Sequence, residues 1–481
     1  MWIRLFFMDC DKNKIIMAKL KLRGKDLIKI GYPQGKVIGI AINRMLEYHR
    51  KRNKTYVLDL LSDVLAAPSN YLDDVQMGPI AEQLIDPRKT ERFQLKAQRV
   101  AHKIYGIDQV QEGAVMQLYT ALKLPIALQG ALMPDAHQGY GLPIGGVLAV
   151  ENAVIPYGVG NDIGCRMSLS IYDYPVKRLG GEGERFKKML MENTRFGGSD
   201  TFDRRLEAEV MDDPAFDEVM TLKNWKSLAY KQLGTSGSGN HFVEFGVVEI
   251  KEPIREYNLE AGTYLGILAH SGSRGFGAKI AKHYTTLAMK QCPLPKEAKH
   301  LAWFDLDRQE GMEYWMAMTL AGDYASANHH QIHRRLSKAL GEKPLAIIEN
   351  HHNFAWREQL EDGTEVIVHR KGATPAGKGV LGIIPGSMAT HGFIVRGKGE
   401  PASINSASHG AGRAMSRKEA TQTFTKSSMK KFLKAQGVEL IGGGVDEAPQ
   451  AYKDIYTVME QQRDLVEVLG TFFPRIVRMD E

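Results

Sequence analysis

Cysteine is scarce in this 481-residue chain, which contains only three. So few thiols cannot form a disulfide framework, and we therefore expect a protein of a reducing compartment, the cytoplasm. Apolar runs are short, and none approaches the roughly 18 residues that a transmembrane helix needs, so we expect no membrane association. The sequence also shows no internal repeat and no low-complexity tract.

Charge of one sign is not in large excess either. The 63 Lys and Arg residues outnumber the 56 Asp and Glu residues and give a net charge of +7, which permits a polyanionic partner without requiring one. Hydrophobic residues make up 43% of the chain, enough to bury a large core. Glycine, in contrast, is abundant, with 48 residues, about one in ten against an average near 7%.

The chain divides into three segments. Residues 1–16 are unlike the rest, and we interpret them as a leader or a gene-prediction artefact. Residues 17–92 are predicted to form a small helical extension, and residues 93–481 are predicted to form a catalytic domain. In the extension, Ile38, Ile42, Met45 and Leu46 recur at helical spacing, and leucine-rich residues 58–65 predict a second helix that ends before Pro68.

A basic run, His-Arg-Lys-Arg-Asn-Lys, occupies residues 49–54 of the extension. Residues 24–39 resemble a short helical element in the RNA-binding part of tRNA nucleotidyltransferases. One interpretation is a helix pair that contacts RNA. The other is an ordinary packed extension with a solvated charged face.

Short apolar runs dominate the middle of the chain and predict strands at residues 126–128, 147–150, 167–171, 265–269, 345–349 and 366–369. Glycine-rich turns with polar residues able to bind metal or phosphate adjoin most of them. Residues 426–436 and 452–469 are predicted to be helices. Together these patterns indicate an α+β protein.

Four of the glycine-flanked positions carry residues suited to metal ions. Asp162 and Cys165 stand three residues apart, and His241, His270 and the pair at 351–352 follow later. A thiolate, imidazoles and a carboxylate together suit one divalent ion or a pair. Singly, each residue is better explained as an inert thiol, a buried histidine or a turn residue. Their recurrence in similar settings favours a metal site, and the chain has neither zinc-finger spacing nor HExxH.

A second group of residues is typical of phosphate binding. Cations at Arg274, Lys371, Arg413 and Arg417 lie in glycine-rich or basic contexts. If a helix begins near Gly410, its free amide groups face a bound anion.

Taken in order, these motifs resemble the tRNA-splicing ligase RtcB family, from about residue 92 to the C-terminus. They are MPDAHQGYGLPIGG (133–146), the loop from Asp162 to Cys165, GSGNHF (237–242), HSGSRG (270–275), HHN (351–353), VHRKGAT (368–374), PGSM (385–388) and HGAGRAMSR (409–417). The resemblance implies mixed sheets flanked by helices. It also implies that GTP and two Mn²⁺ ions serve to join an RNA 3′-phosphate or 2′,3′-cyclic phosphate to a 5′-hydroxyl through a GMP–histidine intermediate.

The resemblance also implies roles for individual residues. Asp162, Cys165 and His241 correspond to ligands of one Mn²⁺, and Cys165, His270 and His352 to ligands of the other. His409 corresponds to the nucleophile and Asp135 to the carboxylate that orients it. Arg274, Arg413 and Arg417 correspond to contacts with RNA phosphates. The implied guanylate-binding positions are Asn240, His241, Phe242, Val243, Glu244, His352, Asn353, Pro385, Gly386, Ser387, Met388, His409, Gly410, Ala411, Gly412 and Tyr452.

Two departures from the family pattern concern the nucleotide. The family usually ends in Lys-Gly, whereas Met479 stands near the expected lysine, with Arg475 and Arg478 as candidate substitutes; Gly392 replaces a commoner serine. The expected partners are RNA, such as tRNA halves or broken RNA, and an archease-like activator; the sequence predicts no oligomeric state. Two other functions stay open: a dinuclear metal phosphohydrolase acting on RNA ends, and a non-catalytic RNA-binding component.

Overall fold

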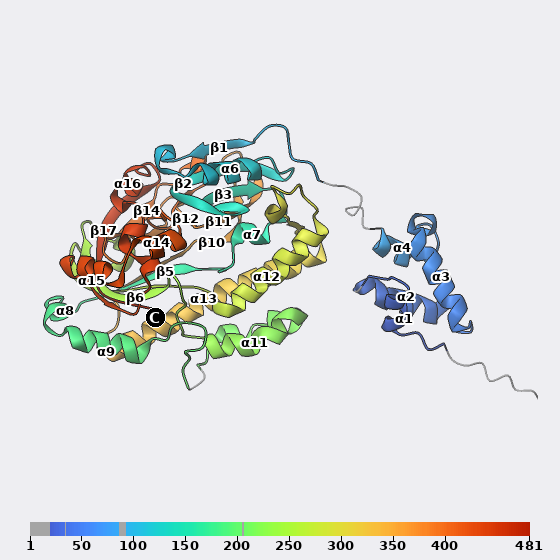
Figure 1. The fold of residues 1–481 in the computed structure, drawn as a ribbon, viewed down its shortest axis with the longest axis horizontal. Coiled ribbons are helices and arrows are strands. Elements are labelled where there is room, and N and C mark those ends of the chain that lie inside the picture. The colour runs from blue at the N-terminus through green and yellow to red at the C-terminus, as the bar shows by residue number, and fades with distance from the viewer. Residues whose placement is uncertain (1–19, 34, 86–92, 204–205) are drawn as a thin grey trace, which may run out of the picture. The chain divides into compact units, whose positions relative to one another are not determined.

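The protein is described by a computed structural model that covers residues 20–33, 35–85, 93–203 and 206–481 (Figure 1). The chain divides into two compact units, residues 1–92 and 93–481. The segment interpreted as a leader, residues 1–16, lies outside the described residues. None of the described helices combines the length and the hydropathy that crossing a bilayer requires.

The smaller unit is helical, as predicted. Its α-helices are α1 (Gly24–Lys29), α2 (Lys36–Tyr48), α3 (Lys54–Ala66) and α4 (Gly78–Leu84). In α2 the fully buried stripe is Val37, Ala41 and Met45, while Leu46 of the predicted stripe is 38% exposed. The side chain of Asn53 caps α3 by accepting the N–H of Tyr56.

The basic run of the smaller unit is exposed in the structure. Arg50, Lys51, Arg52 and Lys54 are all exposed, and the guanidinium of Arg52 lies 5.1 Å from the centre of the Tyr56 ring. Exposure suits both an RNA-contacting surface and a solvated face, so both interpretations of this run stay open.

The larger unit is built on two large sheets. The five-stranded sheet has the order β1 (Ala101–Ile104), β2 (Ala127–Tyr140), β3 (Leu142–Val150), β11 (Glu365–Lys371), β10 (Asn353–Gln359). The eight-stranded sheet has the order β13 (Leu381–Ile384), β14 (Gly392–Gly397), β17 (Val466–Met479), β6 (Phe242–Ile250), β7 (Gly262–Ser271), β5 (Arg166–Tyr172), β9 (Ala346–His351), with β16 (Glu439–Ile441) paired to β17. Two-stranded sheets join β12 (Ala373–Pro375) to β15 (Ser406–Ser408) and β4 (Ala153–Val154) to β8 (Phe304–Asp305).

The sheets are mixed and flanked by helices, which confirms the predicted fold class. The pairs β1–β2 and β16–β17 are parallel, and the other pairs are antiparallel. The end strands β13 and β9 also lie in contact, and the side chain of Asn350 bonds the backbone of Ile383 at both its N–H and its carbonyl, so the larger sheet nearly closes.

Helices of the larger unit surround these sheets (Figure 1). They are α6 (Glu112–Ala121), α7 (Pro156–Val159), α8 (Lys177–Gly181), α9 (Gly183–Asn193), α10 (Ala215–Glu218), α11 (Met220–Gln232), α12 (Arg274–Gln291), α13 (Gln309–Leu340), α14 (Arg417–Thr423), α15 (Lys426–Ala435) and α16 (Ile455–Glu460). Long α13 packs on β7, and its residues Ile332 and Leu336 share a buried cluster with Phe186 of α9 and Phe245 of β6.

All six predicted strands are present, in β2, β3, β5, β7, β9 and β11. The helix predicted over residues 452–469 is wrong, because only α16 is helical and Val466 already begins β17. That strand pairs with both β14 and β6. Hydrogen bonds between β17 and two strands that are distant in the sequence outweigh the helical tendency that the local residue pattern indicates.

Candidate active site

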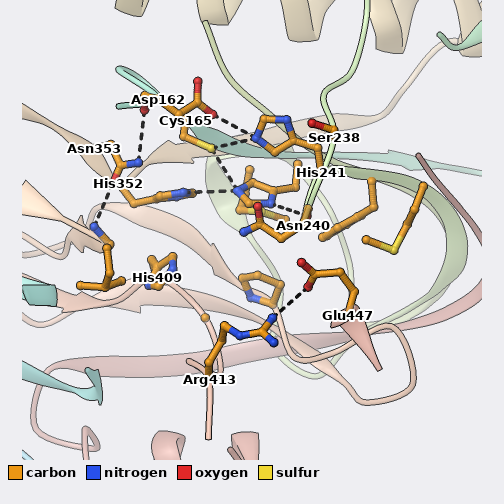
Figure 2. Close-up of a pocket in the computed structure, with 18 of the residues that line it drawn as sticks. Asp162, Cys165, Ser238, Asn240, His241, His352, Asn353, His409, Arg413 and Glu447 are labelled. Carbon is orange, nitrogen blue, oxygen red and sulfur yellow. Dashed lines mark hydrogen bonds and ion pairs between the residues drawn. The ribbon is translucent and has the colours of Figure 1, made fainter. Parts of the chain in front are cut away.

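A cavity of about 660 Å³ opens at one end of the eight-stranded sheet (Figure 2). Its size falls in the usual range for small-molecule sites. Cys165, His241, His270, His352 and His409 all line it.

Strand pairing brings four of these residues together. In β5, Met167 pairs with His270 of β7, and Arg166 pairs with His351 of β9; in β6, Phe242 pairs with His270. Antiparallel pairing places the start of one strand beside the end of its neighbour. The loops before β5 and β6 therefore lie next to the ends of β7 and β9. The side chains of these loops and strand ends converge at the same end of the sheet.

Five predicted metal ligands form two clusters that share the Cys165 thiol, Asp162–Cys165–His241 and Cys165–His270–His352. The Cys165 Sγ atom lies 3.1 Å from His270 Nε2 and 3.5 Å from His241 Nε2. The Nε2 atoms of His270 and His352 are 3.3 Å apart. The Asp162 Oδ2 atom lies 3.0 Å from His241 Nε2, as the dashed lines of Figure 2 show.

The protonation states of the second cluster suit a divalent cation. His270 Nδ1 lies 3.0 Å from the Asn240 carbonyl, which can only accept, so the proton is on Nδ1 and the Nε2 lone pair faces the cluster. Burial lowers the pKa of His270 to about 3 and that of His352 well below its ordinary value. Both rings are therefore neutral, the form that binds metal.

Charge at the shared position and in the first cluster also suits a cation. Burial raises the pKa of the Cys165 thiol well above its ordinary value, so this sulfur ionises when a positive ion binds beside it. Burial raises the pKa of Asp162, but the hydrogen bond and the charge of His241, together with Cys165 and Arg274, outweigh burial and bring the pKa to about 2. A charged carboxylate, a thiol and three imidazoles make a donor set that fits divalent ions.

Two glycines let the ligand loops approach closely. A Cβ atom at Gly272 would overlap the Asp162 carboxylate, and a Cβ atom at Gly237 would overlap the ring of His241. Only glycine fits at either position without moving a ligand. The glycine-rich turns therefore serve to bring backbone against the metal ligands.

His409 is held by a buried carboxylate. Its Nδ1 donates to Asp135 Oδ2 at 2.6 Å, and the same oxygen accepts the backbone N–H groups of His409 and Gly410 at 3.2 and 3.3 Å. Asp135 is fully buried. With the Nδ1 proton directed at Asp135, the lone pair of a neutral ring would be on Nε2. The rings of His409 and His352 lie 4.9 Å apart between centroids, so this nitrogen adjoins the metal-ligand clusters.

No helix begins near Gly410, so the condition set for anion binding by helix amides at this point is not met. Residues 409–412 form a loop after β15, and α14 begins only at Arg417. Gly412 has φ +72°, and a Cβ atom there would overlap the Asp135 backbone. This left-handed residue holds the loop against the carboxylate that orients His409, which is incompatible with a helix.

The three predicted RNA-phosphate arginines line the cavity, and each already has partners. Arg274 donates to the Gly197 carbonyl at 2.7 Å and to Thr235 at 3.2 Å. It adopts φ +58°, a conformation that costs energy for any residue but glycine and clusters at functional sites.

Arg413 and Arg417 share carboxylate partners. Arg413 Nη1 lies 3.3 Å from Glu447, Arg417 Nη1 lies 2.6 Å from Asp446, and Arg417 also pairs with Glu447. The Tyr452 hydroxyl donates to Glu447 as well. One buried glutamate thus connects two predicted phosphate contacts with a predicted nucleotide contact.

Most of the predicted nucleotide positions line the cavity. They are Asn240, His241, Phe242, His352, Asn353, Pro385, Gly386, Ser387, Met388, His409, Gly410, Ala411, Gly412 and Tyr452. Val243 and Glu244 do not; Val243 packs in a hydrophobic cluster, and burial raises the pKa of Glu244 well above its ordinary value.

Neither candidate arginine, Arg475 or Arg478, lines the cavity. Met479 lines the cavity. The Arg475 guanidinium lies 4.7 Å from the centre of the Phe473 ring, and Arg478 donates to the carbonyls of Leu190 and Thr194. This end of the cavity therefore presents a thioether instead of a positive charge.

Sequence reasoning assigned no role to three residues of the site. His137 lines the cavity, and burial lowers its pKa to about 4. Lys453 donates to the carbonyls of Pro134 and Ala136 and so braces the part of β2 that carries Asp135. Glu447 is the third. His137 lies within a motif noted above, whereas nothing local in the sequence points to Lys453 or Glu447.

The fold and the site together define a class: an α+β protein in which two clusters able to hold metal ions share one thiol, beside an imidazole hydrogen-bonded to a buried carboxylate. The sequence model of the family described as tRNA-splicing ligase RtcB matches residues 117–222 and 209–480. The chain belongs to this family.

Individual relatives agree with the family assignment. The chain is 34% identical over 397 residues to RNA-splicing ligase RtcB of Escherichia coli K12, covering 75% of this chain and 93% of the relative. It is 28% identical over 440 residues to tRNA-splicing ligase RtcB of Thermococcus kodakarensis, covering 76% and 91%. It is 32% identical over 431 residues to RNA-splicing ligase RtcB homolog 1 of Entamoeba dispar, covering 74% and 79%.

Proposed function

We propose that the protein is an RNA ligase that joins an RNA 3′-phosphate or 2′,3′-cyclic phosphate end to a 5′-hydroxyl end, using GTP, two Mn²⁺ ions and a GMP–histidine intermediate. The observation that carries this proposal is the His409–Asp135 hydrogen bond of 2.6 Å directly beside the two ligand clusters. A metal-dependent phosphohydrolase would need only the two clusters of metal ligands. An imidazole held in one orientation by a carboxylate is typical of a side chain that acts as a nucleophile.

In the proposed first step, the His409 Nε2 lone pair attacks the α-phosphorus of GTP. A P–N bond forms, the bond to pyrophosphate breaks, and pyrophosphate leaves. Asp135 holds the proton on Nδ1 at 2.6 Å, which keeps Nε2 free to attack and stabilises the positive charge that develops on the ring.

The metal ions have a defined place in this proposal. Asp162, Cys165 and His241 would hold one ion, and Cys165, His270 and His352 the other. A divalent ion bound there neutralises charge on the phosphoryl oxygens. Carboxylate and imidazole ligands admit Mn²⁺.

In the later steps, water first opens a 2′,3′-cyclic phosphate end to a 3′-phosphate and a 2′-hydroxyl. GMP then passes from His409 to an oxygen of the RNA 3′-phosphate, so that a P–O bond forms and the P–N bond breaks. The 5′-hydroxyl of the second RNA end then attacks the activated phosphate, a phosphodiester forms, and GMP leaves. Arg274, Arg413 and Arg417 line the cavity, where guanidinium groups suit phosphate oxygens.

The test is transfer of label from GTP to the protein. Incubation with α-labelled GTP and Mn²⁺ is expected to give protein-bound label that is labile to acid and stable to base, as a phosphoramidate should be. The His409→Ala variant is expected to take up no label, because it lacks the attacking nitrogen. His102→Ala, which removes an exposed histidine outside the cavity, serves as the matched control and should label normally.

Two results would contradict the proposal. Label in His409→Ala would place the nucleophile elsewhere. A wild-type protein that removes phosphate from RNA ends yet never takes label would instead be a phosphohydrolase.

A further inference from the structure

The segment from α14 to α15 is strongly basic. Residues 417–434 hold six Lys and Arg residues against one acidic residue, Glu419, whose carboxylate caps α14 through Ser416. Five lysines of the segment are exposed, and among the described residues none of them forms an ion pair with a carboxylate. We call these five the lysine ridge: Lys418, Lys426, Lys430, Lys431 and Lys434.

The lysine ridge adjoins the cavity. The buried face of α15, Met429 and Leu433, packs in one cluster with Met479, Met388 and Phe242, three residues that line the cavity. At the other end of the segment, Arg417 lines the cavity directly and begins α14. The ridge therefore lies next to a cavity wall, and its α15 lysines are exposed while Met429 and Leu433 of the same helix are buried. Figure 1 shows α14 and α15 in orange-red.

Both helices are capped at their N-termini. Ser416 and Thr425 form capping boxes at the starts of α14 and α15. Lys426, Lys430 and Lys434 are spaced four residues apart, so they follow one another along one side of the helix. Ten residues of α-helix extend about 15 Å, so the side chains form an extended line of positive charge.

We propose that the lysine ridge binds the phosphates of the RNA strand that enters the cavity, several nucleotides from the reacting end. This inference rests on the proposed function, because it extends the path of the same RNA. Lysine is the cation that holds a flexible polyanion without reading its sequence.

An acidic protein partner is the less favoured occupant. Lysine is depleted in protein–protein interfaces, whose centres are apolar and aromatic. Among the described residues, the exposed large hydrophobic side chains include none from α14 or α15. A surface of lysines without an apolar centre suits a phosphate backbone.

The experiment measures RNA binding by the full chain against salt concentration. The variant changes Lys426, Lys430, Lys431 and Lys434 to glutamine. The matched control changes Lys103, Lys296, Lys338 and Lys343, which are exposed and outside the cavity lining. The probes are an RNA of about 20 nucleotides with a 5′-hydroxyl and a 3′-phosphate, and a trinucleotide with the same ends.

We expect the ridge variant to bind the long RNA at least tenfold more weakly at moderate salt than the control variant does. Its plot of log affinity against log salt should be shallower by about 0.7 for each lysine that neutralises a phosphate. Trinucleotide binding and labelling by GTP should match the control. Equal affinity and slope in the two variants would overturn the inference, as would an equal loss of trinucleotide binding.

Failure of the proposed function gives a different result. In that case the wild type takes no label from GTP, whatever the RNA measurements show. A ridge variant that labels normally but binds long RNA as tightly as the control rejects the ridge alone.

Discussion

Replacing Cys165 by alanine is expected to weaken Mn²⁺ binding at both clusters at once, by more than about 100-fold. Loss of a residue that only hydrogen-bonds to a metal ligand already lowers metal affinity by about 10- to 100-fold. The reason is geometric: the Cys165 sulfur belongs to both clusters. Labelling by GTP should fall with metal binding. Titration with Mn²⁺, followed by electron paramagnetic resonance of the free ion, measures both sites.

Three further variants make this result specific. Asp162→Asn should weaken only the cluster with His241, and His352→Asn only the cluster with His270. Cys292→Ala removes the other described buried cysteine, which belongs to neither cluster, and should keep both sites. If the Cys165→Ala variant still binds two Mn²⁺ ions with unchanged affinity, the Cys165 thiol is not a ligand shared by both ions.

Replacing Asp135 by asparagine is expected to slow labelling by GTP by about 10³- to 10⁴-fold, the size of effect seen where an aspartate orients a catalytic histidine. Asparagine offers an N–H group to Nδ1, which moves the ring proton to Nε2 and blocks attack. Binding of Mn²⁺ should change little, since Asp135 belongs to neither cluster. Single-turnover labelling at saturating GTP isolates the effect.

Asp108→Asn is the control for this change, because it removes an exposed carboxylate outside the cavity lining. It should label at the wild-type rate. A wild-type rate in Asp135→Asn as well would mean that the 2.6 Å hydrogen bond to His409 has no part in the reaction.

Local sequence predicted the strands well and the long-range contacts of the site poorly. Runs such as residues 265–269 become central strands because their apolar side chains pack on both faces. Residues 452–469 were misjudged, since the pairing of β17 with β14 and β6 depends on partners far away in the chain.

The same limit applies within the site. Motif resemblance pointed to the residues of both clusters and to His409, which adjoin recognisable glycine-rich turns. It did not find Lys453, whose contacts with residues 134 and 136 span more than 300 positions. It also did not find Glu447, whose importance comes from holding Arg413, Arg417 and Tyr452 together.

The most direct test of the account is anomalous X-ray scattering at the manganese edge from crystals of the protein grown with Mn²⁺. We predict two peaks, one between Cys165, Asp162 and His241 and one between Cys165, His270 and His352, with the sulfur as a ligand of both. A single peak, or two peaks that leave the Cys165 sulfur uncoordinated, would contradict it.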